Sequence, residues 1–167
     1  MSLSKEERLD NIRLALNLLL EALGNQYYRT PLFNREADVF DKIFSTTWQE
    51  LIDKCYLRST ANGYFLELTA SGWRECLRLS GKLQDDTFKR YLGRISQVLK
   101  DRVKGRHHAQ FVRPEEVATE VGIPLGLVLN VIDSDLLMYE FNRVTAKWAS
   151  HEGGAIEVPT NFGLELI

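Results

Sequence analysis

The stretch "EEVATEVGIPLGLVLNVI", residues 115–132, predicts two short helices joined by a tight turn. Pro114 precedes the stretch and suits the first turn of a helix, and two glutamates follow at the positive end of the helix dipole. We expect this helix to run to about Val121. Gly122 fits the turn because glycine adopts a positive φ without a steric penalty. The second helix, expected over residues 124–137, contains no lysine or arginine.

The sequence on either side of this pair predicts the rest of one domain. A preceding helix carries apolar residues at helical spacing on one face, namely Phe88, Tyr91, Leu92, Ile95, Val98, Leu99 and Val103. Phe111 and Val112 are expected to form a short strand. Residues 138–158, "MYEFNRVTAKWASHEGGAIEV", are expected to form two or three strands, with a hairpin tip at residues 150–154.

The first half of the chain predicts the same plan of helices followed by a hairpin. Its first helix carries a leucine-rich stripe, formed by Leu9, Ile12, Leu16, Leu19 and Leu23. A second helix is expected to begin at Asn34, with Ala37, Phe40, Ile43 and Phe44 facing inward. A third is expected from Trp48 to Cys55. Asn62 and Gly63 then favour a type I′ hairpin turn, because both central positions of that turn need a positive φ.

A polar, glycine-containing stretch over residues 80–86 follows a further helix that contains Trp73 and Leu77. We expect the domain boundary in this stretch. The chain is therefore predicted to contain two domains, residues 1–82 and residues 83–167. The expected fold class is mainly α with small β-hairpins (α+β).

Two stretches resemble the winged-helix fold, a three-helix core with a β-hairpin wing. "YFLELTASGW" in the first half looks like the strand-to-helix ending of bacterial winged-helix domains, and residues 115–132 are similar to the helix–turn–helix pattern. In that pattern Ala118 fits the close helix crossing, and Ile123, Val128 and Val131 fit the shared core. The resemblance implies tandem winged-helix domains. Such domains serve in transcription, replication and protein assembly alike.

The second helix of the pair occupies the position from which such folds read DNA. Base edges are read by bidentate donors, and phosphates are contacted by positive charge. The helix instead carries leucine and aspartate side chains. Its expected outer residues are Leu125, Leu127, Leu129, Asn130 and Asp133. We predict that this surface binds a protein partner or a second copy of the chain. Two alternatives remain open, burial of the helix between the two halves of the chain and base readout.

A basic stripe crosses the middle of the sequence. Residues 82–108 hold eight basic and three acidic residues, a net charge of +5, whereas the whole chain is −2. The stripe is either the solvated face of an amphipathic helix or a patch that binds phosphates. In the second case the chain is a DNA-binding transcriptional regulator. The candidate phosphate-binding residues are Lys89, Arg90, Arg94, Lys100, Arg102, Lys104 and Arg106, with Arg58 near the first wing.

Motifs that carry chemistry are missing from the sequence. It has no glycine-rich phosphate loop, CxxC pair or HExxH helix, and its three histidines have no ligand spacing. We therefore expect no catalytic residue, no metal, no cofactor and no small-molecule substrate. Cys55 and Cys76 are expected to be reduced thiols in the core of a cytoplasmic protein. The apolar run from Leu14 to Leu23 is too short and too polar for a membrane span.

Overall fold

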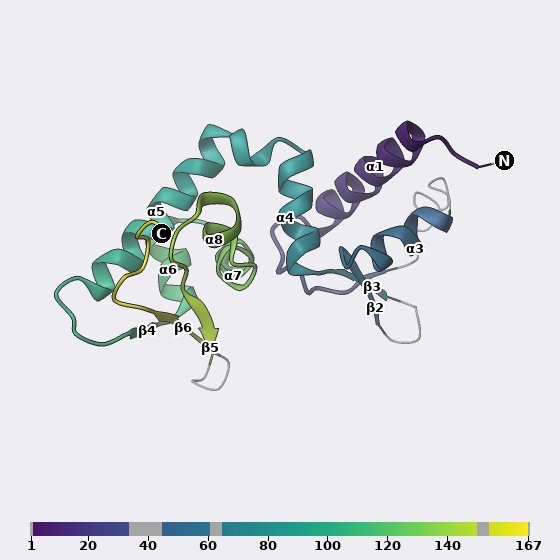
Figure 1. Ribbon diagram of the computed structural model, residues 1–167. Helices are drawn as coiled ribbons and strands as arrows, with labels where there is room; N and C mark the ends of the chain where they lie inside the picture. The colour runs from purple at the N-terminus through teal and green to yellow at the C-terminus, as the bar shows by residue number, and fades with distance from the viewer. Residues whose placement is uncertain (1, 34–44, 61–64, 150–153, 167) are drawn as a thin grey trace. The chain divides into compact units, whose positions relative to one another are not determined.

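The computed structural model describes residues 2–33, 45–60, 65–149 and 154–166 (Figure 1). Three expectations lie outside these ranges: the helix beginning at Asn34, the Asn62–Gly63 turn, and most of the hairpin tip at residues 150–154. Contacts divide the chain into two compact units. The first unit holds residues 1–24 and 28–82, and the second holds residues 25–27 and 83–167.

The first unit combines helices with a three-stranded antiparallel sheet. Its helices are α1 (Lys5–Leu23), α3 (Ser45–Asp53) and α4 (Ala70–Leu79), and its strands are β1 (Leu32–Phe33), β2 (Leu57–Thr60) and β3 (Phe65–Leu68). The strand order is β1-β3-β2. Ser4 begins α1 through a capping box with Glu7, which satisfies two backbone donors that a helix start leaves open.

The core of the first unit forms where α1 packs against α4. Four of the five residues predicted to face inward on α1 are buried, namely Ile12, Leu16, Leu19 and Leu23. The fifth, Leu9, is 54% exposed, so the expected stripe is one turn shorter than the sequence suggested. The rings of Tyr28 and Trp73 stack with centroids 6.3 Å apart in the same core.

The second unit repeats the combination of helices and a three-stranded sheet. Its helices are α5 (Asp86–Val103), α6 (Pro114–Val121), α7 (Leu125–Asp133) and α8 (Leu136–Phe141), and its strands are β4 (Gln110–Val112), β5 (Lys147–Ala149) and β6 (Ala155–Val158). The strand order is β4-β6-β5, so in both units the last strand lies in the centre. A short 3-10 helix, Lys82–Gln84, precedes α5. The fold is therefore α+β, as the sequence predicted.

The predicted helix over residues 124–137 is two helices. The first, α7, ends at Asp133, and Asp135 takes a left-handed conformation with φ 54° before α8 begins. Residues 138–141 belong to α8, so the prediction of strand at this point was wrong. Leu136 and Leu137 continue the apolar spacing of α7, which hides the break in the sequence pattern.

The two cysteines differ from each other. Cys76 is buried in α4, as expected, whereas Cys55 is exposed and its placement in the core was wrong. The physical reason is that α3 ends at Asp53, so Cys55 lies in the turn beyond the helix with a φ of 61°. In the part of the chain that the structure describes, no helix is long and apolar enough to cross a membrane.

Candidate functional site

Helix α7 is held in place by the turn that precedes it. Gly122 ends α6 with a φ of 76°, and Pro124 is extended at the start of α7. The inner side of α7 is anchored in the core of the second unit by Val128, Val131 and Ile132, each at most 1% exposed. This packing fixes the rotation of α7 about its axis and therefore determines which of its residues face away from the core.

The residues predicted to form the outer surface of α7 are not equally exposed. Leu125 is 38% exposed, whereas Leu127, Leu129 and Asp133 are half-buried. Asn130 is only 2% exposed, although the sequence placed it on the outside. The surface of α7 is therefore partly covered within the second unit.

The chain itself supplies this cover through the short segment Asn25–Tyr27, which belongs to the second unit. The side-chain amide of Asn130 donates a 2.9 Å hydrogen bond to the backbone carbonyl oxygen of Gln26. The hydroxyl of Tyr27 donates a hydrogen bond to the carboxylate of Asp133. Two of the five predicted surface residues thus have polar partners within the chain.

Gly126 allows this segment to lie directly on the helix. A Cβ at this position would overlap the carbonyl oxygen of Asn25 and the backbone of Gln26. A glycine inside a helix lowers its stability and often marks a close backbone approach. This contact was not predicted, and Gly126 within an apolar helix was the one signal in the sequence that could have indicated it.

Two of the predicted phosphate-binding residues are engaged in ion pairs. Arg102 pairs with Glu116 at 3.2 Å and with Glu120, both on α6. Arg58 lies on β2 in the first unit and pairs with Glu67 on the neighbouring strand. These two guanidinium groups already have carboxylate partners, so they hold elements of the fold together.

The remaining cations occupy different parts of α5 and the loop after it. Arg90 and Arg94 are exposed and four residues apart on the helix, so they share a face. Lys104 follows the last residue of α5, and Arg106 lies in the loop beyond it; both are exposed. Lys89 and Lys100 instead line a pocket, so the structure separates them from the arginines.

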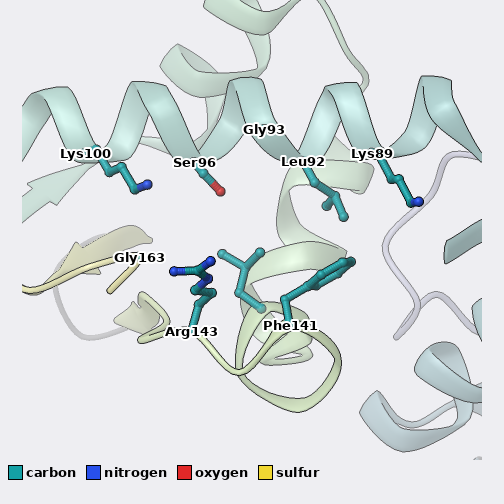
Figure 2. Close-up of a pocket in the computed structure, with 9 residues that line it drawn as sticks. Lys89, Leu92, Gly93, Ser96, Lys100, Phe141, Arg143 and Gly163 are labelled. Carbon is teal, nitrogen blue, oxygen red and sulfur yellow. The ribbon is translucent and has the colours of Figure 1, made fainter. Parts of the chain in front are cut away.

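This pocket, which we call the α5 pocket, has a volume of about 290 Å³ and lies within the second unit (Figure 2). It is lined by Lys89, Leu92, Gly93, Ser96, Lys100, Leu137, Phe141, Arg143 and Gly163. The lining therefore combines three cationic side chains with leucine and phenylalanine. Sequence reasoning did not predict this pocket, because α8 and the C-terminal segment approach α5 through tertiary packing.

Titratable groups offer little chemistry in the described residues. Burial, followed by the charge of Glu75, raises the pKa of the Cys76 thiol to about 12, so this thiol is protonated near neutral pH. Burial also raises the pKa of Tyr56. Across the described ranges, no three histidine, cysteine or acidic side chains are grouped so that they could hold a metal ion.

Models of protein families gave no match to the sequence, and neither curated proteins nor solved structures gave one.

Proposed function

We propose that the chain is a non-catalytic interaction module, a regulator or adaptor made of two winged-helix domains, which acts through protein contacts. The shared strand order of the two sheets supports the tandem arrangement. The order α5, β4, α6, α7 and the β5–β6 pair, with the short helix α8 inserted before β5, supports the winged-helix assignment of the second unit. A helix pair joined at a left-handed glycine is typical of helix–turn–helix folds.

The functional proposal rests on one observation. Helix α7, in the position from which winged-helix domains read DNA, packs against the backbone of the segment Asn25–Tyr27. Asn130 is the residue of α7 best suited to bond an adenine, and its amide is already bonded to Gln26. Leu125 is the large apolar side chain of this helix that stays most exposed. A surface of leucine without cations gains free energy by meeting apolar groups rather than phosphates.

A second candidate is DNA binding through α5. The exposed pair Arg90 and Arg94 favours it, because their side chains share a face of the helix. The pairing of Arg58 and Arg102 with carboxylates weighs against it, since it removes two of the eight candidate phosphate contacts. We therefore rank DNA binding second.

Association with protein is tested by sedimentation velocity over a concentration series, together with capture of proteins from the source cells. The variant Leu125→Glu places a charge on the exposed part of α7, and Leu164→Glu is the control because Leu164 is exposed outside this helix. We expect self-association or capture that Leu125→Glu abolishes and Leu164→Glu retains. A strict monomer that captures nothing dependent on Leu125 would overturn the proposal.

A further inference from the structure

The α5 pocket has one wall made by a single face of α5. Lys89, Gly93, Ser96 and Lys100 follow one another at intervals of four, three and four residues. This spacing places all four on the same side of an α-helix. Figure 2 shows the side chains of Lys89, Ser96 and Lys100 leaving α5 on the side that faces Phe141 and Arg143. The pocket is therefore a cleft between a rigid helix and the chain around α8.

Positive charge dominates the polar part of the cleft. Lys100, Ser96 and Arg143 lie at one end in Figure 2, and Lys89 lies at the other. Among the described residues neither lysine makes an ion pair, and no acidic residue lines the pocket. Arg143 makes one long ion pair, in which its guanidinium lies 3.5 Å from the Glu165 carboxylate. Both groups of that pair are solvent-exposed, and such pairs are weak enough to yield to a better placed anion.

The middle of the cleft is apolar. Leu92 on α5 and Leu137 on α8 line it and are each 6% exposed, while Phe141 keeps 36% of its surface exposed. Figure 2 shows the ring of Phe141 turned toward Leu92 on α5. An anion with no apolar part would make no favourable contact with these three side chains. A ligand that fits the whole cleft therefore joins a charged head to an apolar body.

Two glycines keep the cleft open. Nothing lies within 4 Å of a Cβ built at Gly93, so no neighbouring atom requires a glycine in the middle of this helix. A helix-interior glycine without a packing reason lowers stability, and such departures from local preference are expected at functional sites. At Gly163 a Cβ would overlap Cε of Lys100, so this glycine lets the lysine lie across the C-terminal segment.

We propose that the α5 pocket binds a small organic carboxylate with an apolar body. Lys100 and Arg143 bind the carboxylate, with the hydroxyl of Ser96 as a further donor. Leu92, Leu137 and Phe141 contact the apolar body. The volume of about 290 Å³ lies at the lower end of ligand pockets, which restricts the ligand to a small molecule. The inference goes beyond the proposed interaction function, because it assigns a ligand site to the same chain.

The test is an NMR titration of the full chain with 3-phenylpropanoate, monitored by the backbone amides of the second unit. Its neutral counterpart 3-phenylpropanamide tests the charge, and inorganic phosphate tests the anion without an apolar body. We expect saturable shifts at Gly93, Ser96 and Gly163 with the carboxylate, and at least about tenfold weaker binding of the other two compounds. Equal binding of the amide or of phosphate would overturn the assignment of the ligand class.

Matched variants separate the pocket from general charge. Lys100→Ala and Arg143→Ala are each expected to weaken 3-phenylpropanoate binding about tenfold, since each removes a charge-assisted contact. Arg94→Ala removes the same charge from α5 outside the pocket, and we expect it to leave binding unchanged. Gly93→Leu fills the cleft from the helix side and should abolish binding while the chain stays folded. Binding that survives Gly93→Leu, or no binding to the wild-type chain at about 10 mM ligand, would refute the site.

Discussion

The side-chain amide of Asn130 donates a 2.9 Å hydrogen bond to the backbone carbonyl oxygen of Gln26, across 104 residues of sequence. Asn130 lies on α7 and is 2% exposed, so its side-chain amide cannot turn to water when the bond is lost. The bond therefore links the stability of the second unit to a segment from the first part of the chain.

Replacing Asn130 tests this link. We expect Asn130→Ala to lower the free energy of unfolding by about 0.5–1.5 kcal/mol, because the hydrogen bond of its buried amide to the Gln26 carbonyl oxygen is lost. Urea unfolding followed by circular dichroism measures the change. Thr119→Ala is the control, since its hydroxyl bonds the Glu115 carbonyl on an exposed face. The control should change stability by less than about 0.5 kcal/mol, and an equally small effect of Asn130→Ala would contradict the contact.

The two glycines inside α5 and α7 should respond to alanine with opposite signs. Gly93→Ala is expected to raise the free energy of unfolding by about 0.5–1 kcal/mol, because the helix gains propensity and the site is open. Gly126→Ala is expected to lower it by about 1–3 kcal/mol, because the new methyl group meets the Asn25 carbonyl oxygen. Thermal or urea unfolding of both variants gives the comparison. If both variants are stabilised, the segment Asn25–Tyr27 does not lie on α7.

The two cysteines should differ in their reactivity toward a thiol reagent. Cys55 is exposed, whereas Cys76 is buried and its thiol donates a 3.3 Å hydrogen bond to the Leu16 carbonyl. At pH 8 we expect a disulfide reagent such as dithionitrobenzoate to modify one thiol in the native chain and two in denaturant. A Cys55→Ser variant identifies which thiol reacts. Fast modification of that variant would show that Cys76 is accessible.

Cys76 should also make stability depend on alkaline pH. Its pKa is about 12 in the folded chain, against about 8.5 for a free thiol. Between these values the unfolded chain has released a proton that the folded chain keeps, so stability falls as pH rises. The expected contribution of Cys76 to the slope is about 1.4 kcal/mol per pH unit above pH 9, and the slope should be smaller by this amount in the Cys76→Ala variant. Parallel slopes for the two proteins would disprove the raised pKa.

The parts of the fold that the sequence predicted are those set by local pattern. The stripe from Phe88 to Val103 needs only its own spacing to predict α5, and Gly122 predicts a turn from its backbone freedom alone. The break before α8 was missed because the apolar spacing continues through Leu136. Asp135 is a residue type that tolerates a left-handed backbone, but one aspartate within an apolar pattern does not by itself predict a helix end.

The candidate sites depended on contacts that no local pattern contains. The outward direction of Asn130 was inferred from helical spacing alone, but its partner Gln26 lies in a distant segment that covers it. Arg102 counted as a free cation because the carboxylates of Glu116 and Glu120 follow it by 14 and 18 residues, on another helix. The α5 pocket needed the approach of Arg143 and Gly163 to two lysines that the sequence had assigned to phosphate.

The central claim is that the chain acts through protein contacts rather than by binding DNA. The most direct measurement is sedimentation velocity of a fluorescent DNA duplex with an excess of the chain at about 50 mM salt. The account predicts that the duplex sediments as it does alone, at this salt concentration and at higher ones. A duplex that sediments with the chain at about 50 mM salt and is released near 200 mM would contradict it.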